Sequence, residues 1–216
     1  MNLFVFDFHG TLEQGTERAV IDISNRVLEQ HDYTHRFTET DVDRLYGLRW
    51  IKYFEDLLPH ESTERHRELE LACFTMSSQN FDIVRKHIKP APYAHEVLQA
   101  IAQSPHDQIV ISNTQPLSLP RFLDSVDMTK YFPKSHAFAA GNHVDAPGQS
   151  KEEILDRKMK AGRYQRVIAI GDSPQDVNLA KAFGGTSYLY AHPWREFKEA
   201  EADFRIKDLR DVLREL

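Results

Sequence analysis

The sequence has one cysteine, Cys73, in 216 residues and no long uninterrupted apolar run. A single cysteine cannot form a disulfide within the chain, so we expect the protein to reside in a reducing cytoplasm. The first apolar run, residues 3–8, lacks a basic leader and is broken by Asp7. No run approaches the ~20 apolar residues of a membrane span. We therefore expect neither a secretion signal nor a membrane anchor.

The sequence also lacks an excess of basic charge. Its formal net charge is -6 and its isoelectric point is near 6.0. This balance provides no sequence-wide positive field to gather nucleic acid or an anionic membrane, so we expect neither partner. Any anionic ligand must be held by a few local groups. A monomer and a homodimer are both compatible with the composition.

Short apolar runs alternate with helical patterns over most of the chain. Residues 2–8 are rich in aromatic and β-branched side chains and stop at Gly10, which is typical of a strand buried on both faces. The pattern predicts further strands at residues 108–112, 136–139, 166–170 and 186–190, and helices at 94–103, 117–126, 151–161 and 175–183. Residues 203–216 offer a short edge strand and a closing helix. The alternation indicates an α/β protein with a doubly wound, Rossmann-like parallel sheet.

The alternation stops between residues 14 and 89. Apolar positions such as Val20, Ile23 and Val27 are spaced three and four apart, which indicates helices, and the stretch has no convincing strand. Pro90 and Pro92 mark the return to the alternating pattern. We expect an all-helical insertion at 14–89 within a core formed by 1–13 and 90–216.

Polar residues follow three of the predicted strands. These residues are Asp7, the pair Ser112 and Asn113, and Asp172. Groups placed just after parallel strands converge at one edge of the sheet, where ligands bind. Each residue taken singly is also a common cap or turn residue. The functional interpretation therefore rests on the set.

Lys151 opens a predicted helix, and Asp176 follows Asp172 by four residues. Together with Asp7 and Ser112, these residues provide the carboxylates, the ammonium and the hydroxyl that are needed to bind and transfer a phosphoryl group. A phosphate and two carboxylates repel one another unless a hard divalent cation lies between them, and Mg²⁺ suits oxygen ligands. Lysine and a hydroxyl can hold the remaining phosphate oxygens, where charge is stabilised in the transition state.

Four segments, in order, resemble the signatures of the haloacid dehalogenase-like hydrolase superfamily. They are DFHGTL at 7–12, VISNT at 110–114, QSKEEIL at 149–155 and GDSPQD at 171–176. Each falls at a predicted strand end or helix start, so the four together are specific. The resemblance implies a Rossmann-like core and a mobile helical cap in the insertion after the first motif.

The resemblance also implies roles for the residues at phosphorus. Asp7 would attack the phosphorus and form an aspartyl-phosphate, which water then hydrolyses. Ser112 and the amide of Asn113 would bind phosphate oxygens, while Lys151 would neutralise both the phosphate and the nucleophile.

For the metal, the resemblance implies that Asp7 and Asp172 hold Mg²⁺, with Asp176 as a further ligand or as support. Gly10 and Thr11 would shape the turn beside the nucleophile and approach the phosphate, because a main chain without side-chain bulk can come close. The expected activity is magnesium-dependent hydrolysis of a small phosphorylated metabolite.

His9 departs from the family pattern, which has a second Asp there in the phosphatases. In those enzymes the backbone carbonyl of that residue binds Mg²⁺ and its side chain exchanges protons with the leaving group and with water. A histidine keeps the carbonyl, so metal binding is retained. His9 can itself be the acid-base group, since a free imidazole has a pKa of ~6.5. Alternatively the leaving group needs no proton, or the site binds phosphate or metal with little turnover.

Two other functions remain open. Phosphonoacetaldehyde hydrolase has Ala at the position of His9, and the segment LYGLRWIKYF at 45–54 resembles its cap. Trp50 occupies the place of its imine-forming lysine and Lys52 is offset, so we rank phosphonate cleavage lower. The other alternative is a binding or regulatory protein on a catalytically weak scaffold. Arg49 is a candidate for binding an anionic substrate. The alternative, that it is a solvated helix residue, is equally open.

Overall fold

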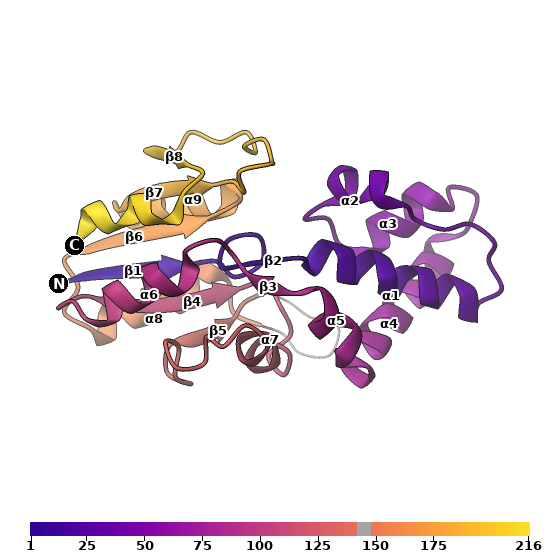
Figure 1. Ribbon diagram of the computed structural model, residues 1–216, viewed down its shortest axis with the longest axis horizontal. Coiled ribbons are helices and arrows are strands. Elements are labelled where there is room, and N and C mark those ends of the chain that lie inside the picture. The colour runs from indigo at the N-terminus through magenta and orange to yellow at the C-terminus, as the bar shows by residue number, and fades with distance from the viewer. Residues whose placement is uncertain (142–147) are drawn as a thin grey trace. The chain divides into compact units, whose positions relative to one another are not determined.

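The computed structural model describes residues 1–141 and 148–216, which fold into two compact units (Figure 1). One unit comprises Met1–Gln14 and Lys89–Leu216. The other comprises Gly15–Ile88.

The first unit is built on a six-stranded sheet with the strand order β5-β4-β1-β6-β7-β8. Its strands are β1 (Asn2–Phe6), β4 (Asp107–Ser112), β5 (Ala137–Ala139), β6 (Arg166–Gly171), β7 (Thr186–Tyr190) and β8 (Phe204–Ile206). All five pairings are parallel. The central strand β1 runs between β4 and β6, with Val5 opposite Ile109 and Ala169. The expected α/β doubly wound fold is therefore confirmed.

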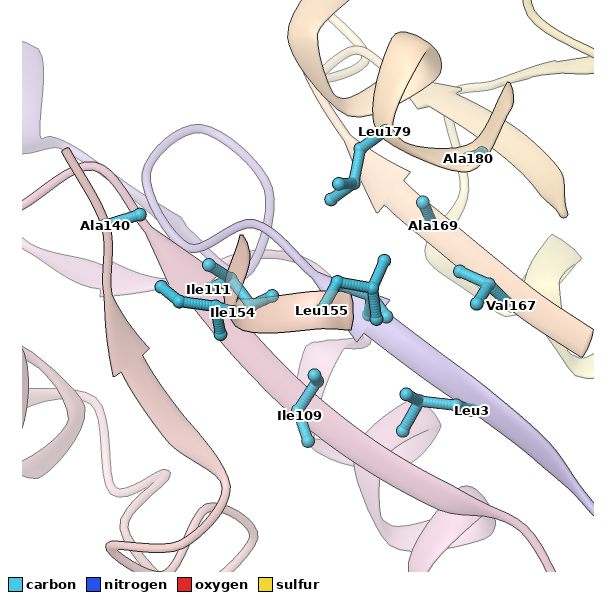
Figure 2. Packing of buried hydrophobic residues seen from close by; sticks show 11 residues of the cluster. Leu3, Ile109, Ile111, Ala140, Ile154, Leu155, Val167, Ala169, Leu179 and Ala180 are labelled. Carbon is cyan, nitrogen blue, oxygen red and sulfur yellow. The ribbon is translucent and has the colours of Figure 1, made fainter. Parts of the chain in front are cut away.

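Helices cover both faces of this sheet because side chains alternate along each strand. On one face, Leu3 and Val5 join a buried apolar cluster with α8 (Lys151–Ala161) and α9 (Pro174–Ala182). The helices contribute Ile154, Leu155, Leu179 and Ala180, which point at the sheet (Figure 2). On the other face lie α6 (Ala94–Ala102) and the 3₁₀ helix η1 (Leu209–Glu215). Gln108 donates a hydrogen bond to the carbonyl of Leu98 on α6. A further helix, α7 (Leu119–Ser125), follows β4.

Two features differ from the sequence prediction. A two-residue antiparallel ladder joins β2 (Glu13–Gln14) to β3 (Lys89–Pro90), where no strand was expected. Strands this short carry no periodicity that a sequence pattern can reveal. The closing helix is 3₁₀ and not α, and its buried residues Leu209 and Val212 are three apart, which matches the 3₁₀ repeat.

The second unit is helical throughout. Its helices are α1 (Thr16–Gln30), α2 (Glu39–Leu45), α3 (Trp50–Leu57), α4 (Thr63–Gln79) and α5 (Phe81–His87). Its apolar core includes Val27, Phe54, Leu69 and Cys73, each fully buried. Across residues 1–141 and 148–216, none of the helices has both the length and the apolar character needed to cross a membrane.

Leu155 tests the packing of α8, the helix that begins at Lys151. Its side chain is fully buried among sheet residues, so Leu155→Ala should lower the free energy of unfolding by about 2–5 kcal/mol through lost burial and the cavity left behind. Urea unfolding measures this change. Leu117→Ala is the control, because Leu117 is 87% exposed and its truncation should change stability by less than about 0.5 kcal/mol. Equal effects of the two substitutions would contradict the packing described for α8.

Candidate active site

Asp7 is fixed at the carboxyl end of the central strand. Its backbone N–H donates to the carbonyl of Ile170 at 2.8 Å, so pairing with β6 continues one residue beyond β1. The chain then turns sharply, and the carbonyl of Phe8 accepts the N–H groups of Thr11 and Leu12 at 3.2 and 3.0 Å. Gly10 makes this turn possible because its φ is 78°, in the left-handed region that favours glycine.

Lys151 joins two carboxylates from separate parts of the chain. Its Nζ donates to Oδ1 of Asp7 at 2.7 Å and to Oδ1 of Asp176 at 2.8 Å. The lysine side chain is only 2% exposed. A capping box positions it: Ser150 Oγ accepts the N–H of Glu153, and Glu153 accepts the N–H of Ser150. The lysine is thus held at the first turn of a well-capped helix.

Asp172 and Asp176 complete an acidic cluster at the end of β6. One carboxylate oxygen from each of Asp7, Asp172 and Asp176 can be chosen so that all three oxygens lie within 4.8 Å of one another. Oδ2 of Asp176 accepts hydrogen bonds from Ser173 Oγ at 2.6 Å and from Ser173 N at 3.3 Å, and these bonds hold the side chain in place. Gly171 leaves room for it, since a Cβ at that position would come 2.1 Å from Cγ of Asp176. These hard oxygen donors fit a divalent cation such as Mg²⁺.

The charges within the cluster do not balance. The pKa of Asp7 is raised from 3.8 to about 6, and burial is the main cause. The Lys151 ammonium lowers this pKa, whereas the carboxylates of Asp176 and Asp172 raise it further. Burial lowers the pKa of Lys151, but Asp7 and Asp176 outweigh it and hold the lysine protonated. One buried ammonium therefore faces three carboxylates, and the site has a deficit of positive charge.

His9 is paired with a buried acid. Its Nδ1 lies 2.9 Å from Oε1 of Glu13, whose side chain is 1% exposed. The imidazole also makes edge contacts with the rings of Phe8 and Phe122, at centroid distances of 5.1 and 4.7 Å. Burial lowers the pKa of His9, but the hydrogen bond and charge of Glu13, followed by the charges of Asp7 and Asp172, raise it overall above 6.5.

Two buried hydroxyls at this end of the sheet have no hydrogen-bond partner within the described residues. They are Oγ of Ser112, at the end of β4, and Oγ1 of Thr11, in the turn after Asp7. Buried polar atoms are nearly always bonded, so these hydroxyls are suited to a ligand. Asn113 follows Ser112, and its side-chain amide donates to Oε1 of Gln175 at 2.7 Å, which joins the loop after β4 to the first turn of α9.

The predicted site residues of the first unit thus lie after neighbouring strands or in the first turns of α8 and α9. Asp7, Lys151, Asp172 and Asp176 form one cluster. Arg49 belongs to the other unit. There its Nη2 lies 3.4 Å from both oxygens of Glu70, whose side chain is 6% exposed. A buried carboxylate gives Arg49 a structural role, and its contact with substrate stays a prediction.

Sequence reasoning missed two residues of the site, Lys198 and Glu13. Nζ of Lys198 lies 2.9 Å from Oδ2 of Asp172. Lys198 lies in the segment between β7 and β8 and belongs to no motif, so its sequence carried no signal. Glu13 had one weak signal, its four-residue spacing from His9.

The raised pKa of Asp7 predicts a pH dependence of stability. The native state binds more protons than the unfolded state between pH 3.8 and about 6, so its free energy of unfolding falls as pH rises through this window. Asp7→Asn abolishes this proton uptake. The variant should exceed wild type in stability at about pH 8, and the gain should vanish towards about pH 4.

Urea unfolding with a metal chelator present measures this difference. Asp156→Asn is a matched control on α8, because Asp156 is 49% exposed and should leave the wild-type pH dependence unchanged. An Asp7→Asn variant with the wild-type slope would show that Asp7 titrates normally in the native state.

Comparisons with known proteins identify the family and the fold. The sequence matches the haloacid dehalogenase-like hydrolase family over residues 4–189. No curated protein matches the chain in sequence.

The fold is similar to that of several solved structures. A candidate phosphatase from Clostridium difficile aligns over 100% of this chain and 99% of its own, with a TM-score of 0.81 and 17% identity. A candidate β-phosphoglucomutase from Thermotoga maritima covers 100% of both chains, with a TM-score of 0.70 and 23% identity. A predicted phosphoglycolate phosphatase from Haemophilus somnus covers 99% of this chain and 97% of its own, with a TM-score of 0.77 and 15% identity. At these identities the structures show the fold alone, whereas the family match spans most of the sequence: the protein belongs to the haloacid dehalogenase-like hydrolases.

Proposed function

We propose that the protein is a phosphatase that hydrolyses a small phosphorylated metabolite through an aspartyl-phosphate on Asp7. The observation that carries the proposal is the position of Asp7, 2.7 Å from a buried lysine and within a cluster of three carboxylates. Two of the structural neighbours are named as phosphatases, one of them as a phosphoglycolate phosphatase, and a third is named as a β-phosphoglucomutase. All three names refer to phosphorylated substrates or phosphate release, which supports the proposal.

In the first step a carboxylate oxygen of Asp7 attacks the phosphorus, and the bond from phosphorus to the leaving oxygen breaks. His9 donates a proton to that oxygen, for which its raised pKa suits it near neutral pH. In the second step water attacks the phosphorus and gives a proton to His9, and the bond to Asp7 breaks. Inorganic phosphate is released and Asp7 is restored.

Other residues stabilise charge during both steps. Lys151 neutralises Asp7 and the phosphoryl oxygens from its buried position. The hydroxyls of Ser112 and Thr11 are donors for phosphate oxygens, which would supply their missing partners. The amide of Asn113 and the turn at Gly10 offer further main-chain donors.

Mg²⁺ fits the carboxylate cluster, and we propose Asp7 and Asp172 as ligands with the carbonyl of His9. Asp176 is a further ligand or a support, since its two oxygens bind Lys151 and Ser173. When bound, the cation would neutralise the repulsion between the carboxylates and a phosphate.

The helical unit Gly15–Ile88 is proposed as the cap that selects the substrate, with Arg49 as the candidate contact for an anionic group. Phosphonate cleavage is disfavoured by the position of Lys52, which forms an exposed ion pair with Glu55 on α3.

Asp7→Asn tests the proposed nucleophile. A panel of phosphate esters, assayed for phosphate release with Mg²⁺, should be turned over by wild type and at least about 10³-fold more slowly by the variant, because the attacking carboxylate is absent. Asp156→Asn should retain wild-type activity, since this exposed residue pairs with Lys160. A wild-type protein inert on the panel but activated by His9→Asp would favour the binding or regulatory alternative.

Lys198→Met tests the metal site without turnover. Removing an ammonium 2.9 Å from Asp172 leaves the cluster more negative, so Mg²⁺ should bind about tenfold more tightly by the Coulomb estimate. Titration calorimetry of Mg²⁺ in the absence of substrate measures the dissociation constant. Lys130→Met removes a lysine from a comparable 2.7 Å ion pair with Asp127 and should leave the dissociation constant unchanged. Weaker binding to Lys198→Met would mean that Asp172 needs its lysine to be positioned for the cation.

A further inference from the structure

His9, which departs from the family pattern, lies beside the buried carboxylate of Glu13. Glu13 lies at the other end of the turn after β1, and its Oε1 is 2.9 Å from Nδ1 of His9. The same oxygen accepts the backbone N–H of Gly10 at 3.3 Å. The side chain of Glu13 is 1% exposed, whereas that of His9 is 25% exposed.

Stability alone does not account for a carboxylate at this position. Burying a carboxylate is costly unless its oxygens are well bonded. Oε2 of Glu13 is buried without a hydrogen-bond partner among the described residues. The pairing of β2 with β3 uses only the backbone of Glu13, so an apolar side chain would serve the ladder equally well. The carboxylate contacts the N–H of Gly10 at 3.3 Å and Nδ1 of His9 at 2.9 Å, and the contact with His9 is the shorter.

That contact determines which ring nitrogen carries the hydrogen. An ionised carboxylate only accepts hydrogen bonds, so Nδ1 of His9 must be the donor. In the neutral imidazole the other nitrogen, Nε2, is then the proton acceptor. The edge contacts with Phe8 and Phe122 restrict the rotation of the same ring.

We propose that Glu13 is a positioning residue for His9: it holds the hydrogen on Nδ1 and orients Nε2 to exchange protons at the phosphoryl group. Nε2 gives its proton to the leaving oxygen as the ester bond breaks, and takes one from water as water attacks the phosphorus. The proposal rests on the phosphatase function given above. His9 and Glu13 act as one unit in the place of a single acidic side chain.

Glu13→Met tests the proposal, because methionine is of similar length, tolerates burial and carries only a weakly accepting, uncharged sulfur in place of the carboxylate. We expect kcat to fall by about 10–100-fold with little change in KM, as when the partner of a functional histidine is removed. Glu13→Gln keeps an acceptor and should lose less activity than Glu13→Met. Glu215→Met is the control: Glu215 is 10% exposed and bonded to Tyr188, so its loss should cost stability and leave kcat unchanged.

Two measurements distinguish positioning from a merely structural role. In the ¹⁵N NMR spectrum, the His9 signal, assigned with His9→Gln, should report hydrogen on Nδ1 in wild type and a mixture of tautomers in Glu13→Met. In a His9→Asp background Glu13→Met should raise activity, because two carboxylates would otherwise face each other. A structural role would lower activity in both backgrounds.

The NMR measurement needs no turnover, so it separates this proposal from the phosphatase function. If the protein is inert on phosphate esters but the His9 tautomer still depends on Glu13, the phosphatase proposal fails and the positioning role of Glu13 stands. Wild-type kcat and an unchanged His9 signal in Glu13→Met would overturn the proposal. If Glu13→Met fails to fold, Glu13→Gln decides: a lowered kcat with unchanged KM supports positioning, and wild-type kinetics with an unchanged His9 signal refute it.

Discussion

The bridge from Lys151 to Asp7 and Asp176 is the interaction on which the rest of the site depends. It brings together the end of the first strand, the start of α8 and the first turn of α9, which are far apart in the sequence. A buried ammonium without carboxylates, or buried carboxylates without an ammonium, would be strongly destabilising. The three elements are therefore coupled by charge as well as by the apolar cluster beneath them (Figure 2).

The balance of charge also supports the proposal that the site binds a phosphoryl group together with a cation. The single ammonium of Lys151 does not neutralise three carboxylates. Burial is the main cause of the raised pKa of Asp7, and the charges of Asp176 and Asp172 raise it further. The ammonium of Lys198 is a second positive charge, and it donates a hydrogen bond to Asp172. A divalent cation would relieve the same repulsion, which places Lys198 and the cation in competition for one carboxylate.

His9 shows how a departure from a family pattern can be compensated within a few residues. The turn that presents Asp7 also brings Glu13 back beside His9, through the hydrogen bonds of its main chain to Phe8. The turn itself is formed by main-chain hydrogen bonds and by the left-handed conformation of Gly10. The proposed acid-base unit and the proposed nucleophile thus lie on the same turn.

The strands along the chain, their parallel arrangement and the positions of Asp7, Ser112, Lys151 and Asp172 were accessible from sequence, since each motif lies at a strand end or helix start that the local hydrophobic pattern reveals. The order of the strands across the sheet came only from the structure. Sequence patterns report only on neighbours along the chain. The partners of those residues were not accessible: the β2–β3 ladder, the contact of Lys198 with Asp172 and the bond from Asn113 to Gln175 join segments that only folding brings together. Local periodicity therefore specified the framework and the reactive groups, whereas the charges that surround each group depend on the packing of distant segments.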